Sequence, residues 1–160
     1  MDTQEAFISV IKENEGLIYK VSRAYCDARE DAEDLYQEIV YQLWKSYPSF
    51  RNESKLSTWM YRIALNTSIA HLSKQKKKGE QVPIDDSMLN RTDSNDNNIE
   101  EQSRQLFALI KKLDDIEKGI ILLYLEGKSY AEIAIITGFS TSNVGTRLGR
   151  VKQKLQSQII

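Results

Sequence analysis

The chain of 160 residues has little of what secreted or membrane proteins usually need. Its single cysteine, Cys26, cannot form an internal disulfide, which favours a reducing compartment and predicts a cytoplasmic protein. No apolar run approaches the roughly 20 residues that cross a bilayer, so we expect no direct membrane insertion. The amino-terminal segment MDTQEAF is acidic and polar, and it does not resemble a secretory signal.

Side chains suited to catalysis are equally scarce. The only histidine, His71, is distant in sequence from Cys26, and the chain has no glycine-rich phosphate loop or nucleophile motif. The acidic residues between Asp27 and Asp34 offer carboxylates for a metal ion, and a hydrolase built on them is a distant alternative. They lack histidine partners and the spacing of a calcium loop. We therefore predict no enzyme activity, no cofactor, no metal site and no small-molecule substrate.

The formal net charge of −1 conceals alternating blocks of charge. Residues 1–40 carry a net charge of −6, residues 41–79 carry +7, residues 80–118 carry −5 and residues 119–160 carry +3. Such blocks usually mean that different segments meet different partners. The alternative is an ordinary solvated surface, which would more often interleave the two signs.

Apolar residues recur at spacings of one, three and four along most of the chain, which predicts helices and no strands. One helix is expected from Phe7 to Tyr25, although Gly16 weakens its middle. A second is expected from Ala32 to Tyr47, with Asp27 as its N-cap and Pro48 marking its end. Further helices are expected over residues 56–78, 106–113, 116–125 and 144–155.

Residues 79–102 interrupt this pattern with many Asn, Asp and Ser residues and few apolar ones. This composition predicts a flexible acidic linker. A long surface loop is the alternative, but structureless loops of this length are uncommon inside compact domains. The fold class is therefore predicted as all-α, with two small helical domains at residues 1–78 and 103–160.

The segment from Ser129 to Leu155 fits a helix-turn-helix. Gly138 and Phe139 supply the tight turn, after which Thr141 opens a second helix whose first residues would enter the DNA major groove. A helical hairpin with a solvated basic face is the alternative. The cations available for phosphate contacts are Arg147, Arg150, Lys152 and Lys154.

The helix expected over residues 56–78 combines aromatic and basic side chains. Arg62, Asn66, Ser73 and Lys76 form one polar strip, and Trp59 lies near its start. Aromatic rings stack on unpaired bases while cations follow the backbone, so this helix is a candidate for single-stranded DNA. The alternative is that Trp59 belongs to the hydrophobic core.

Three segments in this order resemble the bacterial RNA polymerase sigma factors of the extracytoplasmic-function group. DAEDLYQE (31–38) is similar to the family's polymerase-binding helix, and FRNESKLSTWMYRIALN (50–66) to its minus-10 reading segment. LLYLEGKSYAEIAIITGFSTSNVGTRLGRVKQKL (122–155) is similar to its minus-35 reading domain. The chain differs from the family at Gly145 and Gly149, where larger side chains are frequent.

The resemblance implies the following roles. Residues expected to face the clamp helices of the polymerase largest subunit are Asp31, Asp34, Gln37 and Glu38. Residues expected to capture a flipped base or contact the melted minus-10 strand are Phe50, Arg51, Asn52, Trp59, Arg62 and Asn66. Residues expected to meet the minus-35 element are Ser142, Asn143, Thr146, Arg147 and Arg150. The linker is expected to run toward the polymerase active-site channel.

The sequence thus predicts a sigma factor that binds core RNA polymerase, recognises promoter DNA and assists strand opening in transcription initiation. No segment resembles a built-in sensor, so control by a separate partner is the expected arrangement, and an anti-sigma factor is one candidate for it. A stand-alone helix-turn-helix regulator is the runner-up, but it leaves the acidic helix and the aromatic segment without a role.

Overall fold

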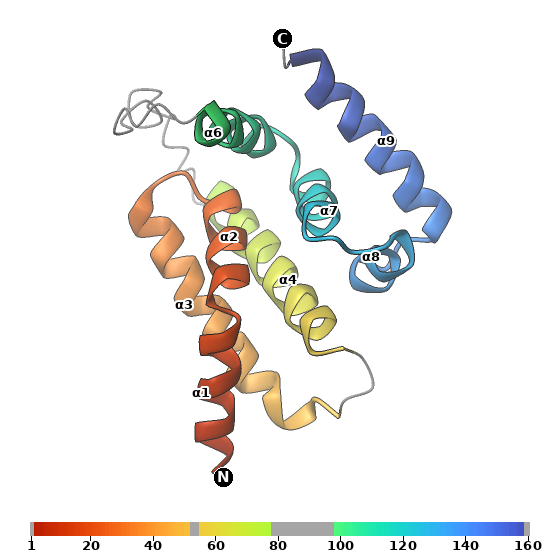
Figure 1. Ribbon diagram of the computed structural model, residues 1–160. Coiled ribbons are helices and arrows are strands. Elements are labelled where there is room, and N and C mark those ends of the chain that lie inside the picture. The colour runs from red at the N-terminus through yellow and green to blue at the C-terminus, as the bar shows by residue number, and fades with distance from the viewer. Residues whose placement is uncertain (1, 52–54, 78–97, 159–160) are drawn as a thin grey trace.

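The computed structural model describes residues 2–51, 55–77 and 98–158, with the side chains of residues 76, 77 and 98–100 excepted. Over these ranges the chain is helical with no strand, which confirms the predicted all-α fold (Figure 1). The helices form an amino-terminal unit, α1 to α4, and a carboxy-terminal unit, α6 to α9.

The first predicted helix is in fact two, α1 (Thr3–Glu13) and α2 (Glu15–Tyr25). The break falls at Asn14, whose side-chain amide donates to the Val10 carbonyl at 2.8 Å while its backbone N–H turns to the Ile11 carbonyl at 3.1 Å. An asparagine that bonds local backbone in this way competes with the regular helix pattern. The prediction of one continuous helix was therefore wrong.

Helices α2, α3 (Arg29–Ser46) and α4 (Leu56–Lys77) pack against one another. The period-3.6 stripe of α3 is confirmed, because Leu35, Ile39 and Leu43 are fully buried. The predicted cap was wrong: α3 starts after Ala28, which offers no side-chain bond, rather than after Asp27. A short 3₁₀ turn, η1 (Tyr47–Ser49), ends the segment at the proline, as predicted.

The second unit consists of α6 (Asn98–Lys111), α7 (Asp115–Leu125), α8 (Tyr130–Thr137) and α9 (Thr141–Gln158). Helix α6 begins inside the segment predicted as linker; residues 79–97 of that segment lie outside the described ranges. Gly138 has φ of +85° between α8 and α9, a left-handed conformation that glycine adopts cheaply. This turn and the buried α9 stripe of Val144, Leu148 and Val151 confirm the helix-turn-helix.

Helix α8 is only 8 residues long, so its start depends on a capping box. The Ser129 hydroxyl accepts from the Glu132 N–H at 3.1 Å, and the Glu132 carboxylate accepts from the Ser129 N–H at 3.2 Å. We expect Ser129→Ala to lower the free energy of unfolding by about 1 kcal/mol, measured by urea denaturation followed by circular dichroism. Ser73→Ala, on the exposed face of α4, is the control and should change little. An equal loss in both variants would contradict the role of the box.

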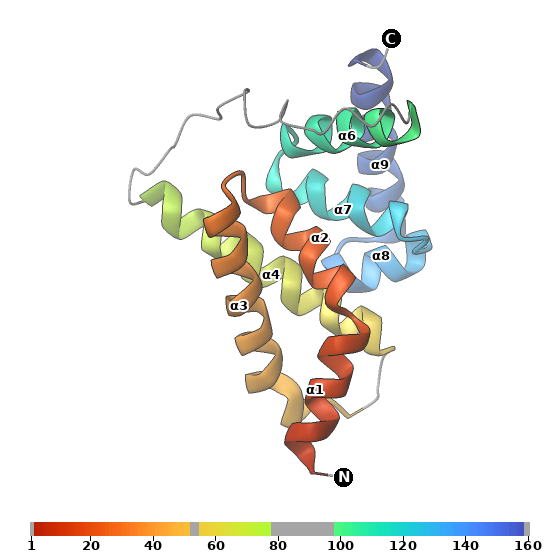
Figure 2. The same cartoon turned by 60° about the vertical axis from the view of Figure 1, so that its left-hand side comes forward.

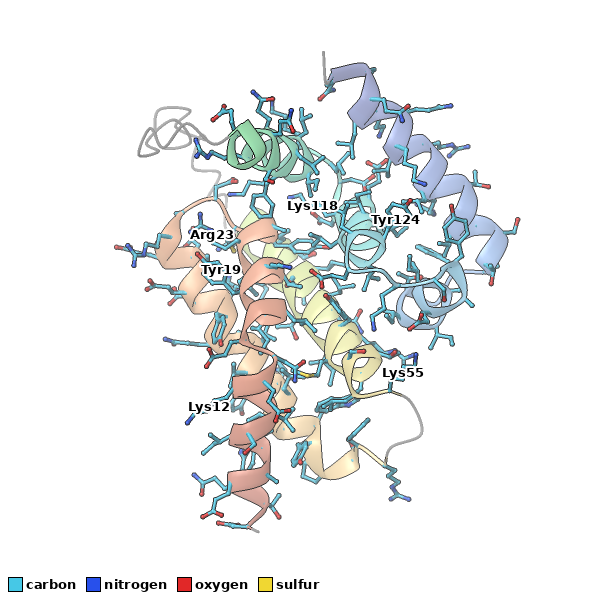
Figure 3. All side chains as sticks on the ribbon, viewed as in Figure 1. Lys12, Tyr19, Arg23, Lys55, Lys118 and Tyr124 are labelled. Atoms are coloured by element: carbon cyan, nitrogen blue, oxygen red, sulfur yellow. The ribbon has the colours of Figure 1, made fainter. Side chains whose placement is uncertain are left out.

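The two units are packed side by side, with α7 and α8 lying along α2 and α4 (Figures 1 and 2). One continuous cluster of buried apolar side chains includes residues of both units (Figure 3 draws the side chains on the ribbon). Nothing in the sequence pattern predicted this contact, because the flexible linker indicated two units without specifying how they meet.

Candidate polymerase and nucleic-acid interface

The predicted polymerase-binding residues lie on one exposed face of α3. Asp34, Gln37 and Glu38 are exposed and Asp31 is half-buried, so the structure brings them together as the helical period requires. The face continues to Tyr41, which is 54% exposed and has the Lys45 ammonium 5.9 Å from its ring centroid. Sequence reasoning missed Tyr41, although its position seven residues after Asp34 places it on the same side of the helix.

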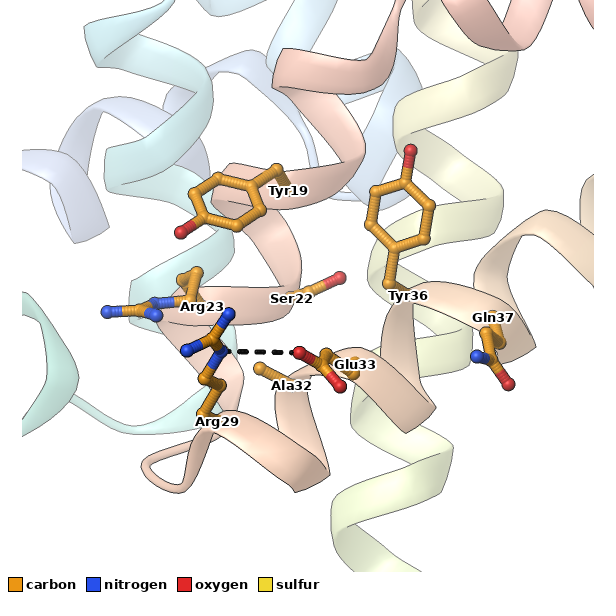
Figure 4. Close-up of a pocket in the computed structure, with 8 residues that line it drawn as sticks. All are labelled: Tyr19, Ser22, Arg23, Arg29, Ala32, Glu33, Tyr36 and Gln37. Atoms are coloured by element: carbon orange, nitrogen blue, oxygen red, sulfur yellow. Dashed lines mark hydrogen bonds and ion pairs between the residues drawn. The ribbon is translucent and has the colours of Figure 1, made fainter.

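A hollow of about 470 Å³ lies between α2 and α3 beside this face (Figure 4). Gln37 contributes to its lining, so it adjoins the acidic face. Its two arginines already have partners. Arg29 pairs with Glu33 at 3.3 Å, and the Arg23 guanidinium lies 5.7 Å from the centroid of the Tyr19 ring. The hollow therefore presents no free pair of cations for an anion.

The aromatic residues before and at the start of α4 pack on one another. The Trp59 ring is half-buried, 4.8 Å from the Phe50 ring and 6.3 Å from the Tyr47 ring, centroid to centroid. Trp59 thus belongs partly to the core, which was the alternative given for it. Arg51 is exposed beside Phe50. Asn52 lies outside the described residues.

The polar strip of α4 is confirmed for Arg62, Asn66 and Ser73, which are all exposed, whereas the Lys76 side chain lies outside the described part. Arg62 does not point freely into solvent. A terminal nitrogen of its guanidinium donates to the backbone carbonyl of Ile135 at 2.8 Å. Ile135 belongs to α8, so this predicted minus-10 contact is bonded to the helix-turn-helix.

On the recognition helix α9, Ser142, Thr146 and Arg150 are exposed. Arg147 is half-buried: its Nε donates to the Asn143 side chain at 3.0 Å, and its guanidinium lies 4.5 Å from the Phe139 ring centroid. Because Arg147 uses Nε to bond Asn143, its two terminal guanidinium nitrogens remain available to donate hydrogen bonds to DNA. The supporting role of Phe139 was missed, although its place in the turn made it a candidate.

The predicted cationic face of α9 is smaller than the sequence indicated. The Lys154 ammonium pairs with the Glu117 carboxylate at 2.8 Å, and that of Lys152 lies 4.2 Å from the Tyr124 ring centroid. Both cations are thus turned toward α7. Among the described side chains Arg150 has no such partner. The two glycines differ, since a Cβ at Gly145 would meet the Tyr130 ring at 3.5 Å while one at Gly149 would meet nothing within 4 Å.

Groups with catalytic potential are not assembled in the described ranges. Cys26 is buried, and that burial raises the pKa of its thiol to about 12, so the thiol stays protonated. No three His, Cys, Asp or Glu side chains of the described residues gather as metal ligands. No helix in this part of the chain is both long and apolar enough to cross a membrane.

A helix-turn-helix whose second helix presents Arg147 and Arg150, joined to a unit with an exposed acidic helix, defines a DNA-reading protein with a second, protein-binding surface. Comparison with known families agrees. Residues 10–78 match the family model Sigma-70 region 2, and residues 103–155 match Sigma-70, region 4. The acidic helix and α4 fall in the first match, and the helix-turn-helix falls in the second.

Proteins with similar sequences are also sigma factors. The chain is 32% identical over 144 residues to the ECF RNA polymerase sigma-E factor of Haemophilus influenzae, covering 82% of this chain and 76% of that protein. It is 28% identical over 158 residues to the RNA polymerase sigma factor SigV of Bacillus subtilis, covering 98% and 93%. The chain belongs to the ECF group of RNA polymerase sigma factors, the promoter-directing subunits of transcription initiation.

Solved structures agree on the fold. The sigma factor RpoE of Bartonella quintana, in complex with the anti-sigma factor NepR, superimposes with a TM-score of 0.73 at 20% identity and 96% coverage of each chain. CnrH, in complex with the cytosolic domain of CnrY, superimposes with a TM-score of 0.68 at 20% identity, covering 97% of this chain and 88% of that one.

Proposed function

We propose that this sigma factor divides its work among three surfaces: α3 binds core RNA polymerase, the start of α4 reads the minus-10 element, and α9 reads the minus-35 element. It has no catalytic group of its own and takes no cofactor or small-molecule substrate. The observation that carries the proposal is the separation of charge. The acidic face is on α3, whereas exposed Arg51, Arg62 and Arg150 lie on the loop before α4, on α4 and on α9.

The α3 face suits a basic protein surface. Its carboxylates, Asp34 and Glu38, are exposed, and the Glu38 carboxylate is bonded only to the neighbouring Gln42 amide at 3.1 Å among the described residues. Complementary charge of this kind speeds encounter and fixes orientation more than it adds affinity. Tyr41 adds an aromatic side chain of the type enriched at interfaces.

The minus-10 role rests on a preformed aromatic platform. Phe50, Tyr47 and Trp59 hold one another in place, so a base turned out of the duplex would meet rigid rings. In this proposal Arg51 and Asn66, which are exposed, would follow the backbone of the melted strand, and Arg62 would join them on leaving the Ile135 carbonyl. The chemistry of RNA synthesis belongs to the polymerase.

Removal of one ring tests the platform. Because aromatic pairs contribute about 0.5–1.5 kcal/mol beyond their buried area, we expect Phe50→Ala to slow promoter opening about tenfold and to spare closed-complex formation. Permanganate footprinting of unpaired thymines in the holoenzyme complex measures opening. Tyr41→Ala removes an exposed ring from α3 and is the matched control, with normal opening once polymerase is saturating. If Phe50→Ala opened the promoter normally and only bound duplex DNA more weakly, Phe50 would be a duplex contact and not part of a base-capturing platform.

We also propose that the protein works in the cytoplasm and that an anti-sigma factor regulates it. The anti-sigma complex of the similar Bartonella protein supports this partner by analogy only. A pull-down from a lysate of the source bacterium, with the full chain as bait, would identify such a partner by mass spectrometry. If only core polymerase were captured, the proposal of an anti-sigma partner would be contradicted, and the protein would be regulated in another way.

The function is tested most directly by run-off transcription with purified core polymerase on a genomic promoter library. Promoter-specific transcripts that require this protein are the expected result. A stand-alone helix-turn-helix regulator would bind DNA without associating with core polymerase, and a hydrolase would show metal-dependent turnover. Either result in place of core-dependent transcripts would overturn the proposal.

A further inference from the structure

Phe7 on α1 is buried against the carboxy-terminal end of α3. It is 6% exposed, and its ring centroid lies 5.0 Å from that of Trp44 and 5.3 Å from that of Tyr47. The planes of the Phe7 and Tyr47 rings are inclined at 61°, an edge-on arrangement. Figures 1 and 2 both show α1 beside this end of α3. Phe7 precedes residue 10, at which the match to Sigma-70 region 2 begins, and it was not predicted to contact DNA or polymerase.

Tyr47 connects Phe7 to the aromatic platform of Tyr47, Phe50 and Trp59. The Tyr47 ring lies 6.3 Å from the Trp59 ring, and the Trp59 ring lies 4.8 Å from the Phe50 ring, centroid to centroid. The series of contacts therefore begins on α1, passes through η1 to α4, and ends on the residue after η1. Aromatic rings at these separations attract one another in preferred orientations, so each ring restricts the next.

Burial decreases along this series. Phe7 is buried, whereas Tyr47, Trp59 and Phe50 are half-buried, and Arg51, which follows Phe50, is exposed. A half-buried ring has attractive neighbours on one side only, so its orientation depends on the groups that support that side. The buried end of the series is thus the fixed one, and the half-buried end is the part on which an unpaired base can stack.

The backbone of η1 fixes the turn but does not by itself fix the rings. The Ser49 hydroxyl donates to the Ser46 carbonyl at 2.7 Å, and the Phe50 N–H donates to the Tyr47 carbonyl at 3.1 Å. These bonds hold the chain as it leaves α3, while the side chains of Tyr47 and Phe50 still have alternative staggered rotamers. Contacts with neighbouring rings select among those rotamers, and of the four rings in the series only that of Phe7 is buried.

The position of α1 itself depends on Phe7. The helix breaks from α2 at Asn14, so the direction of α1 is set separately from that of α2. Phe7 is the only buried side chain of α1, all of which the structure describes, and Val10 and Ile11 are half-buried. One side chain therefore both anchors α1 and touches the platform.

We propose that Phe7 is a positioning residue of minus-10 recognition: it fixes Tyr47 and, through Tyr47, holds the Trp59 and Phe50 rings ready for a base turned out of the duplex. The inference rests on the proposed function of the platform. It gives α1 a part in promoter opening, although Phe7 is buried and does not itself reach DNA.

The two tryptophans of the chain, Trp44 and Trp59, permit a test on the free protein. Trp44→Phe retains an aromatic ring beside Phe7 and leaves Trp59 as the only tryptophan. In this background we expect Phe7→Leu, which keeps an apolar side chain but removes the ring, to raise the acrylamide quenching constant of Trp59 about twofold. Ile18→Val, at a fully buried position of α2, is the control and should leave the quenching constant unchanged.

Promoter opening by the holoenzyme is the second measurement. We expect Phe7→Leu to slow opening about fivefold in permanganate footprinting, while formation of the closed complex is unchanged. Ile18→Val should open the promoter at the wild-type rate. Tyr47→Leu interrupts the series at its middle and should behave like Phe7→Leu, whereas Tyr47→Phe retains the ring and is its control. Circular dichroism checks that each variant keeps its helical content.

A double variant shows whether Phe7 acts through the platform. Residues that act through one another have non-additive effects, so Phe7→Leu should slow opening by less than about twofold when Phe50 is already alanine. If the two effects multiplied instead, to about fiftyfold in the double variant, Phe7 would act by a separate route and the proposal would be overturned.

Equal quenching of Trp59 in Phe7→Leu and Ile18→Val would show that Phe7 does not hold the rings, and would also overturn the proposal. Increased quenching together with normal opening would overturn the positioning role. Normal opening by Phe50→Ala would instead contradict the proposed function of the platform. Because the quenching measurement needs neither polymerase nor DNA, failure of the support by Phe7 and failure of the platform function are distinguishable.

Discussion

Reversing the charges of Asp34 and Glu38 together to lysine is expected to weaken binding to core RNA polymerase about a hundredfold while leaving α3 helical. Both side chains are exposed on the face opposite the buried Leu35 and Ile39, so their replacement leaves the packing of the helix intact. Like charges opposed across an interface cost several kcal/mol, and each tenfold loss of affinity corresponds to about 1.4 kcal/mol.

The measurement is a titration of labelled chain with core polymerase at two salt concentrations. Glu5→Lys with Glu13→Lys makes the same change in net charge on exposed positions of α1 and is the matched control. A general effect of charge would weaken both double variants alike, whereas a local interface is disturbed only by the first. Unchanged affinity in Asp34→Lys/Glu38→Lys, with normal helicity, would remove α3 from the polymerase interface.

Helix periodicity predicted the parts of the fold that depend on burial of one face. The stripe of Leu35, Ile39 and Leu43 on α3 and that of Val144, Leu148 and Val151 on α9 both follow from a spacing that the sequence displays directly. Gly138 was also predictable, because a short apolar helix followed by glycine and a polar helix start has few other turn conformations.

Local competition for backbone hydrogen bonds was not predictable in the same way. Asn14 ends α1 by bonding to Val10, and a single asparagine within an otherwise helical pattern gives no sign of which bond it will choose. Asp27 looked like a cap because of its residue type, but the helix starts one residue later, after Ala28. Element boundaries depend on such small differences in free energy.

Contacts between distant residues were outside the reach of sequence patterns altogether. Lys154 looked free for phosphate until the fold brought Glu117 to it, and Arg62 looked free for DNA until α8 provided a carbonyl. A single sequence gives the charge of a side chain, but it does not show which neighbouring group will pair with that charge in the fold. The candidate site was therefore predicted by residue type and face, while the availability of each residue required the structure.

Arg147 and Arg150 are expected to play different parts at the minus-35 element. The Arg147 guanidinium is held by Asn143 through Nε and by the Phe139 ring, so its two terminal nitrogens form a prearranged fork of the kind that binds guanine edges bidentately. Arg150 is exposed and has no partner among the described residues, as suits a side chain that follows a phosphate.

We expect Arg147→Ala to cost about 1–3 kcal/mol in binding and to relax preference at one minus-35 position. Arg147→Lys should do nearly the same despite keeping the charge, because an ammonium has neither the fork nor the planar stack on Phe139. Arg150→Ala should weaken binding evenly across sequences and reduce the salt slope by about one. Fluorescence anisotropy of the holoenzyme on a set of minus-35 variants, at two salt concentrations, measures all three. If Arg147→Lys kept full affinity and specificity, the side chain would be a phosphate contact, and Asn143 and Thr146 would remain as the candidate base readers.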